Sequence, residues 1–430
     1  MAQINSKKYL FVEHSIKMFI ITIFSLGYLS AQTSGKTDPI ELLLKNNRSV
    51  RAAVETYQAA LKRVETKGVL PDPMIENSTF ILPIETRNGP MENQIMLGQK
   101  FPLWGKLKRE RLIAELQAKN AEFNLQASRI KAVFRMNRAW ANYLKITRSL
   151  KILEQYQAEL ESFRRVALTQ YSTGTGKTQH PILKLQIEMS LIESRINFLQ
   201  SDLETVSNEL QNLFDGSFTP SLFNIDWDLA VPERSAREWV ELADRYNPVL
   251  LRVRNNVTIA NITKELAKRK NYPDLVTGVT YTSVGPTSLG GAPSAGADGL
   301  GVKVGLNLPI WLKRNKARIE SSTLEIKARE ETVEETLNQI EDNVRSIVKE
   351  LFEIDETYNL YDKTLIQESE QMLSSAYAAY ETGKISFLDL LDSERMVVRI
   401  RLDFEDIIAK KRITAAKMLE AVGLITLAKE

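Results

Sequence analysis

Phe101-Pro102-Leu103-Trp104 returns later in the chain in nearly the same form, as Leu308-Pro309-Ile310-Trp311. A Pro-Asp pair precedes each tetrapeptide, Pro71-Asp72 in the first case and Pro273-Asp274 in the second. Basic residues directly follow each tetrapeptide, namely Lys106, Lys108 and Arg109 or Lys313, Arg314 and Lys316. Internal similarity in a constant order is typical of a duplicated structural unit.

Two further similarities flank these motifs. A helical stretch opens at Asn47-Arg48-Ser49-Val50, and another opens at Asn247-Pro248-Val249-Leu250. A short break follows a long polar–apolar run in both cases, at Tyr171–Lys177 and at Tyr380–Lys384. These similarities, all in the same order, indicate a tandem duplication. We place the first repeat at residues 32–232, the second repeat at 233–423 and a C-terminal tail at 424–430.

Each repeat is predicted to contain helices and two strands. In the first repeat we expect a helix, strands over 72–83 and 93–102, a long helix over 105–173, a helix over 181–215 and a linker over 216–232. In the second repeat we expect helices over 235–271, strands over 274–284 and 299–309, a long helix over 312–382 and a helix over 385–422. The predicted fold class is therefore mostly α, with a small β part.

The long runs are predicted to be helices because Lys106–Thr173 and Ile310–Thr382 contain neither Gly nor Pro. Apolar residues recur every seven positions within them, as at Leu116, Phe123 and Ile130. Helices of this length need neighbours along coiled-coil-like seams. The helices alone would also suit a soluble coiled coil.

The non-helical segments point toward a membrane. Leu300–Leu308 alternates strictly between Leu or Val and small or polar residues, and Leu275–Thr282 does so in part. Their lengths match tilted membrane strands with one apolar side. The alternation is weaker in the first repeat, over Ile75–Pro83 and Ile95–Phe101. Two hairpins of an ordinary soluble sheet are the alternative.

Four strands cannot close a membrane barrel, and an open edge cannot face lipid. Known single-chain barrels begin at eight strands. Three copies of this chain would supply twelve strands, so we expect a homotrimer with cyclic symmetry. We place Pro102, Trp104, Pro309 and Trp311 at the level of the lipid headgroups of a membrane, where strands end and Trp is favoured. The basic clusters that follow would face anionic headgroups or form a solvated first helical turn.

The N-terminus carries the features of a secretory signal over residues 1–31. Three lysines precede the apolar run Met18–Leu29, and Leu29-Ser30-Ala31 provides small residues for cleavage. A buried N-terminal helix is the alternative. The run is too short to span a bilayer comfortably, and no later stretch approaches the length of a membrane helix. The formal net charge of the chain is only +3, so we expect no nucleic-acid partner.

The sequence gives little support for catalysis or for binding of a metal or a phosphate group. The absence of cysteine excludes disulfides, thiolate metal sites and a cysteine nucleophile. Thr175-Gly176-Lys177-Thr178 lacks the earlier Gly of a phosphate-binding loop, because Tyr171 stands there. His180 has no clustered ligand-type partner. We therefore predict no catalytic residues, no metal and no cofactor, and we do not expect an enzyme.

The order helix, hairpin, long helix, break and helix, written twice over about Asp38 to Gly423, resembles the TolC family of outer-membrane efflux proteins. The resemblance implies a trimeric twelve-stranded β-barrel in the outer membrane of a diderm bacterium, continued by a long α-helical barrel through the periplasm. It also implies a periplasmic adaptor and an inner-membrane pump of the RND type as partners. Leu70–Pro73 and Gln99–Leu107 are most similar to the heavy-metal/cation efflux branch.

The resemblance also places a gate at the short breaks. The gate turns would contain Tyr171, Gly174, Gly176, Tyr380, Gly383 and Lys384. Asp389 and Asp392, three residues apart on one helical face, would form a cation-attracting ring at the periplasmic entrance. The alternative is that both are ordinary acidic residues, which the helix dipole favours near a helix N-terminus. Pro181 and Ile385 replace an aspartate and an arginine of the family latch, so the closing contacts are not carried over.

We predict a passive outer-membrane conduit for small solutes, drugs or metal cations, within a tripartite efflux complex. An exit duct of a type I protein secretion system would have the same fold. A periplasmic adaptor is the alternative from another class, although an adaptor would carry one helical hairpin and not two.

Overall fold

The computed structural model describes residues 38–172, 179–222, 231–286, 293 and 295–426 of the 430 in the chain. The chain divides into two units, residues 1–39 and 40–430. Only Asp38 and Pro39 of the first unit are described, so the account below concerns the second unit. The expected signal segment, together with Gly174 and Gly176 of the expected gate, lies outside the described residues.

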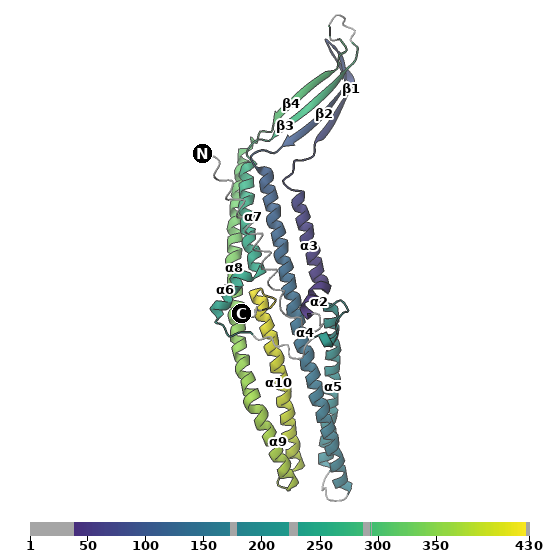
Figure 1. Ribbon diagram of the computed structural model, residues 1–430, viewed down its shortest axis with the longest axis vertical. Helices are drawn as coiled ribbons and strands as arrows, with labels where there is room; N and C mark the ends of the chain where they lie inside the picture. Colours follow the sequence, from purple (N-terminus) through teal and green to yellow (C-terminus); the bar gives the residue numbers. More distant parts are fainter. Residues whose placement is uncertain (1–37, 173–178, 223–230, 287–292, 294, 427–430) are drawn as a thin grey trace. The chain divides into compact units, whose positions relative to one another are not determined.

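The described residues are mostly helical and contain one small sheet, which confirms the predicted fold class (Figure 1). In chain order the elements are α2 (Pro39–Asn46), α3 (Arg48–Glu65), β1 (Met74–Thr86), β2 (Gly89–Phe101), α4 (Lys106–Ser172), α5 (His180–Leu213), a 3-10 turn (Pro220–Leu222), α6 (Ala236–Tyr246), α7 (Pro248–Arg269), β3 (Leu275–Val284), β4 (Gly299–Leu306), α8 (Leu312–Leu360), a π-turn (Tyr361–Leu365), α9 (Ile366–Glu381) and α10 (Phe387–Val422).

The sheet is antiparallel with the order β1-β2-β3-β4. Its central pair joins the two halves of the chain, with Phe101 opposite Leu275 and Leu97 opposite Val279. The first hairpin is tighter than expected, because β1 continues to Thr86 and β2 already begins at Gly89. Residues 84–92, which lie between the two expected strands, therefore belong largely to the strands. In the second hairpin β4 ends at Leu306, short of the expected residue 309.

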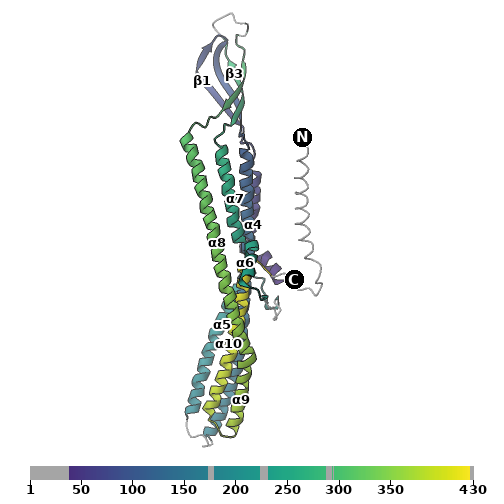
Figure 2. The ribbon, with the colours of Figure 1, turned by 90° about the vertical axis from the view of Figure 1, so that its left-hand side faces the viewer.

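The helix α4 is the central element of the second unit. Its first half packs against α3 and α7, and its second half packs against α5 and α10 (Figures 1 and 2). Asn120 on α4 donates to Asn256 on α7 at 2.7 Å, while Arg148 further along α4 lies 3.3 Å from Glu405 on α10. The helix α8 packs against α7, α6 and α10. The sheet and the helix reversals therefore lie at opposite ends of α4.

The core consists of separate seams between helices. One seam near the middle of α4 is built on Leu43, Trp140 and Phe214, and another surrounds Trp239 on α6. A third seam fills the space between α4, α5 and α10, with Tyr156 and Leu391 in it. Narrow seams of this kind are what heptad-patterned helices produce. No helix among the described residues combines the length and apolar character needed to cross a membrane.

Two asparagines form matching junctions in the two halves of the chain. Asn47 accepts hydrogen bonds from two backbone N–H groups of the first turn of α3, and its amide donates to the carbonyl of Leu213 at 3.1 Å. Asn247 accepts in the same way from the first turn of α7 and donates to the carbonyl of Ala421 at 2.8 Å. Each side chain therefore caps one helix and satisfies a free carbonyl at the end of another.

The long helix expected over 312–382 spans Leu312–Glu381, with a π-turn inside it that the sequence did not predict. The π-turn Tyr361–Leu365 separates α8 from α9. A π-turn replaces i→i−4 hydrogen bonds by i→i−5 bonds without needing Gly or Pro, so the absence of breakers could not exclude it. The helices expected over 235–271 are α6 and α7, which meet at the extended residue Asn247, directly before Pro248 begins α7.

Gly423 ends α10 in the left-handed conformation, with φ of 89°. A Cβ atom at this position would lie 2.6 Å from both the Asn247 Cα and the Tyr246 carbonyl oxygen, which are backbone atoms. We expect Gly423→Ala to destabilise the protein by roughly 2–4 kcal/mol, since the α6–α7 corner must move away. The measurement is the midpoint of thermal unfolding, followed by circular dichroism.

Gly383→Ala is the matched control. Gly383 has φ of 70°, also left-handed, but nothing lies within 4 Å of its added Cβ. The control therefore loses only the conformational preference, about 1–2 kcal/mol. Equal losses in both variants would show that Gly423 is required for its φ alone.

Candidate functional site

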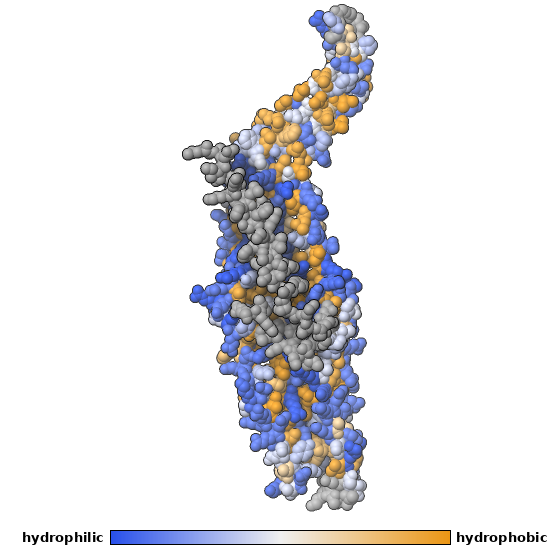
Figure 3. All heavy atoms as spheres, viewed as in Figure 1, coloured by the Kyte–Doolittle hydropathy of each residue, from blue (hydrophilic) through white to orange (hydrophobic). Residues whose placement is uncertain are grey.

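Two regions hold the residues predicted to act: the sheet with the strand–helix junctions beside it, and the tip where the long helices reverse. The sheet exposes large apolar side chains on one face. Ile75, Leu97, Val279 and Val302 lie side by side across the four strands, and Val302 is 80% exposed. Figure 3 shows hydrophobic surface extending over the sheet. Exposed apolar surface on this scale is typical of an interaction surface.

The two outer strands of the sheet are open. Within the described parts of the chain, β1 pairs with β2 alone and β4 pairs with β3 alone. Each outer strand therefore presents one unpaired row of backbone N–H and C=O groups. Ile81 and Leu82 on β1 are 93% and 85% exposed, so the edge is apolar as well as unpaired.

The junction that follows β2 is closed by a buried ion pair. Lys106, only 6% exposed, donates to the Asp274 carboxylate at 2.6 Å and to the Tyr272 carbonyl at 2.7 Å. Lys100 lies 3.2 Å from the other carboxylate oxygen of Asp274. The Trp104 indole N–H donates to the Pro273 carbonyl at 3.1 Å, and its ring packs on Tyr272. The first Pro-x-Trp motif thus binds the second Pro-Asp motif.

This junction corrects one expectation from the sequence. Lys106 belongs to the basic cluster that was expected to face headgroups or solvent, yet it is buried against Asp274. The backbone explains the difference, because Trp104 and Gly105 are both left-handed, with φ of 65° and 70°. Two such residues in succession turn the chain sharply before α4 begins. The glycine directly after Trp104 is the sequence signal for this turn.

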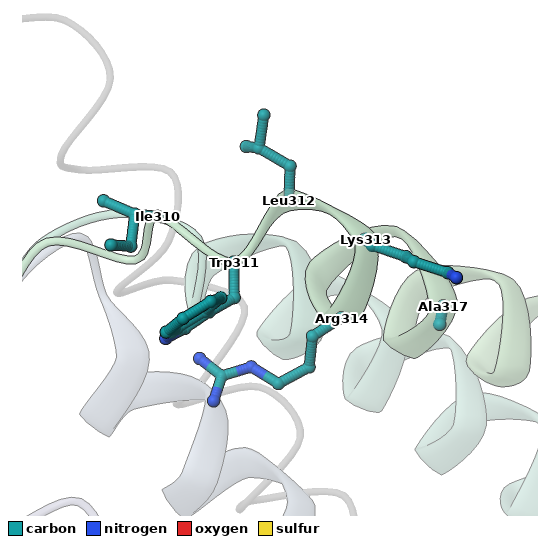
Figure 4. A pocket seen from close by; sticks show the side chains of 6 residues that line it. All are labelled: Ile310, Trp311, Leu312, Lys313, Arg314 and Ala317. Carbon is teal, nitrogen blue, oxygen red and sulfur yellow. The ribbon is translucent and has the colours of Figure 1, made fainter.

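The junction that follows β4 is open. Trp311 is 64% exposed and Leu312 is 77% exposed. Figure 4 shows the residues lining a hollow of about 660 Å³ here, with the Arg314 side chain extending toward the Trp311 ring. The hollow is lined by Ile310, Trp311, Leu312, Lys313, Arg314 and Ala317. Pro102 and Pro309, the other members of the predicted membrane-interface belt, directly precede these two junctions.

At the tip, the α9–α10 reversal is built on Gly383. Its N–H donates to the Tyr380 carbonyl at 2.9 Å, and the Lys384 N–H donates to the Ala379 carbonyl at the same distance. The Tyr380 ring packs against Phe387, with centroids 6.0 Å apart. At the α4–α5 reversal, the Tyr171 hydroxyl accepts a hydrogen bond from Gln179 at 2.9 Å.

Asp389 and Asp392 are both exposed on the first turns of α10 but differ in their partners. Asp389 forms a capping box with Ser386, accepting from its hydroxyl at 2.7 Å and from its N–H at 2.9 Å. These hydrogen bonds lower the pKa of the Asp389 carboxyl. Asp392 instead lies 3.3 Å from Arg395 and 3.6 Å from Lys184. The charge of Asp392 is therefore offset in part by Lys184 and by Arg395, which Asp392 shares with Glu188.

Behind these aspartates lies a polar link that sequence reasoning missed. Arg395 on α10 forms two bonds to Glu188 on α5, at 2.5 and 3.1 Å, and Glu188 is 7% exposed. The Tyr156 hydroxyl on α4 donates to Glu188 at 3.4 Å. Burial, together with the Glu188 carboxylate, raises the pKa of Tyr156 well above its usual value. Three helices from both halves of the chain meet at this carboxylate.

A second buried acid on α10, Glu394, lies nearby and contacts α9. Glu394 is 3% exposed and accepts a hydrogen bond from the Tyr377 hydroxyl. Burial raises the pKa of Tyr377. Both acids stand at an apolar seam position in the sequence. Glu188 lies three residues after Leu185 and four before Ile192. Glu394 lies three residues after Leu391 and four before Val398. An acid at such a position predicts a buried pairing.

Comparison with known proteins supports the fold. No family model and no curated protein matches the sequence. Solved structures are similar to the chain, among them these three. A membrane protein from Pseudomonas aeruginosa has a TM-score of 0.75 and 17% identity, covering 89% of this chain and 91% of that one. The Campylobacter jejuni outer membrane channel CmeC has a TM-score of 0.73 and 14% identity, covering 94% and 91%. CusC has a TM-score of 0.72 and 16% identity, covering 92% and 96%.

We expect Arg395→Met to destabilise the protein by about 1–2 kcal/mol, because it leaves the buried Glu188 carboxylate without its counter-charge. The figure is reduced from the value for a fully buried pair, since the Arg395 side chain is 44% exposed. The double variant Glu188→Gln with Arg395→Met should recover part of the loss, because no buried charge remains. The midpoint of thermal unfolding measures both.

Arg399→Met, one turn further along α10, is the control for this pair. Arg399 is highly exposed and lies 3.9 Å from Asp403, so its loss should change stability by less than about 0.5 kcal/mol. If the double variant were less stable than Arg395→Met, the link would not act through the buried charge.

Proposed function

We propose that this chain, which has the fold of the TolC-type outer-membrane channels, is the outer-membrane channel subunit of a tripartite efflux complex. The observation that carries the proposal is the four-stranded sheet, which combines an exposed apolar face with two unpaired edges. Lipid can cover the apolar face, but it cannot pair the backbone groups of the edges. Only further strands can do so.

Three copies of the chain supply the missing strands in this proposal. Cyclic symmetry would bring β4 of each copy beside β1 of the next, so that twelve strands close on themselves. The helices of the three copies would continue the same ring away from the membrane. The helix α4 has 67 residues, so at 1.5 Å per residue it extends roughly 100 Å. That length suits a duct that crosses much of a periplasm.

The tip would form the closed periplasmic end of this duct. The reversals lie at the end of α4 away from the sheet, and both predicted acids stand on the α10 side of one reversal. Three copies would arrange three Asp389 carboxylates around the entrance. Because Asp392 is paired with Lys184 and Arg395, we assign most of the cation attraction to Asp389.

Transport through such a duct would be passive. No cluster of three or more metal-ligating side chains occurs among the described residues. On the resemblance to the TolC family, we assign the energy and the cargo selection to an inner-membrane pump of the RND type and the connection to a periplasmic adaptor. The cargo class that fits is small solutes, drugs or metal cations.

The first test is the assembly state of the full-length chain expressed in a bacterium with two membranes. We expect a trimer in the detergent-extracted outer-membrane fraction, because only added copies can pair the strand edges. Light scattering corrected for bound detergent measures the protein mass. A monomer released with the periplasmic fraction would overturn the proposal and favour the periplasmic adaptor.

The second test separates the two tip acids. Asp389→Asn should weaken the block of single-channel current by a trivalent cation, added on the periplasmic side, by about tenfold. Asp392→Asn should weaken it much less, because Lys184 and Arg395 already offset that charge. The measurement is the blocking concentration in planar bilayers. Equal effects of the two substitutions would contradict the assignment to Asp389.

The pH dependence of the same block follows from the hydrogen bonds of Ser386. A lowered pKa keeps Asp389 charged to a lower pH than an ordinary aspartate, so the block should persist as the pH falls through the usual aspartate range. Ser386→Ala should move the loss of block to a higher pH. An unchanged pH profile in Ser386→Ala would show that another group controls the block.

A further inference from the structure

The closed junction between the two halves of the chain is a complete recognition unit. One partner is the Pro-x-Trp motif with the lysine that follows it, Trp104 and Lys106. The other partner is a Pro-Asp pair at the start of a strand, Pro273 and Asp274. The indole N–H binds the proline carbonyl and the lysine binds the carboxylate. These contacts join residues 168 and 169 positions apart.

The chain carries a second copy of each partner, and these two remain apart. Alignment of the two tetrapeptides places Trp311 at the position of Trp104 and Lys313 at that of Lys106, while Asp72 corresponds to Asp274. Asp72 and Lys313 are both exposed. Within the part of the chain that the structure describes, neither of them forms an ion pair, unlike their counterparts Asp274 and Lys106.

The topology explains why they cannot meet within one chain. Asp72 precedes β1 and Lys313 follows β4, so the two partners stand at opposite edges of the sheet. Three strand spacings of about 4.8 Å separate those edges. The charges are nevertheless complementary, with Lys313 and Arg314 at one edge and Asp72 at the other. The occupant that fits each edge is therefore the opposite edge of another copy.

We propose that Lys313 of one copy pairs with Asp72 of the next copy, and that this contact sets the register of β4 against the neighbouring β1 with Leu306 opposite Ile75. This inference rests on the proposed function, in which copies close a ring. The open hollow beside Trp311 then receives the Pro71-Asp72 corner of the neighbour. In this contact, Trp311 and Lys313 of one copy take the roles that Trp104 and Lys106 have toward Pro273 and Asp274 within one chain.

The register follows from the closed junction. Phe101, the first residue of its tetrapeptide, lies opposite Leu275, the residue directly after Asp274. The equivalent pair is Leu308 opposite the neighbour's Pro73, and two residues inward it is Leu306 opposite the neighbour's Ile75.

Side-chain alternation is consistent with this register. Leu306 lies opposite Leu275 and so shares a face with Val279 and Val302, and Ile75 lies opposite Leu97 on the same face. The proposed pairing therefore continues the apolar face without interruption. A slip by one residue would place Ile75 opposite Gly305 and turn the apolar side chains of the neighbour to the other side.

Cysteine cross-linking tests the register, and the chain offers a clean background because it contains no cysteine. Leu306→Cys combined with Ile75→Cys should give covalent dimers and trimers when the outer-membrane fraction is oxidised and run on a denaturing gel. Two controls keep Ile75→Cys and move the partner, to Gly305→Cys or to Val304→Cys. We expect at least about tenfold less cross-linked product in the controls, since their Cβ atoms diverge or lie too far apart.

Charge exchange tests the ion pair independently. Lys313→Asp and Asp72→Lys should each lower the fraction of trimer that survives in mild detergent, and the double variant should restore it. Arg314→Asp with Asp72→Lys is the control, because Arg314 aligns with Leu107, which forms no ion pair. This control should show no recovery.

The outcomes separate the register from the function. A trimer that cross-links best through Val304 or Gly305, or that recovers equally with Arg314→Asp, overturns the proposed contact and leaves the channel proposal intact. A chain that never forms a trimer overturns both. Efficient cross-linking through Leu306 and recovery only with Lys313→Asp supports the contact.

Discussion

The pairing of backbone groups along the two outer strands is the constraint on which the rest of the structure depends. An amide or carbonyl without a partner costs several kcal/mol in a medium that cannot form hydrogen bonds. The sheet presents two such rows, along β1 and β4, next to an apolar face that water does not favour. Both features are unfavourable in an isolated chain and favourable in a closed ring within lipid. In the proposed trimer, each chain is one segment of a symmetric ring, in which the edges are paired and lipid covers the apolar face.

The helical region is also held together by hydrogen bonds and ion pairs between distant parts of the chain. The seams between helices are narrow, and each is built on a few large apolar side chains. The ion pair between Glu188 and Arg395 links α5 to α10. Asn47 and Asn247 each join the start of one helix to the end of another. These contacts connect elements far apart in the sequence at points where no wide core exists. Directional bonds therefore supply, in this helical region, the specificity that a globular protein obtains from a large packed interior.

Much of the fold could be predicted because its signals are local. The absence of Gly and Pro predicted α4, and the alternation in Leu300–Leu308 predicted β4. The burial of Lys106 could not be predicted in this way, since its partner Asp274 stands 168 positions away. The π-turn is invisible for a different reason, because it changes hydrogen-bond spacing without changing composition. The repeat boundaries and the roles of the tip residues remain predictions, since the fold alone does not test them.

The π-turn at Tyr361–Leu365 has a consequence for how the tip is oriented. One residue added to a helix rotates everything beyond it by about 100° around the axis, because a turn holds 3.6 residues. Beyond the π-turn α9 packs against α10, while α8 packs against α7, α6 and α10, so the π-turn changes which side chains of the long helix face these neighbours. The π-turn thus lets the α8 segment and the α9 segment of one helix each turn a suitable face toward the helices beside it.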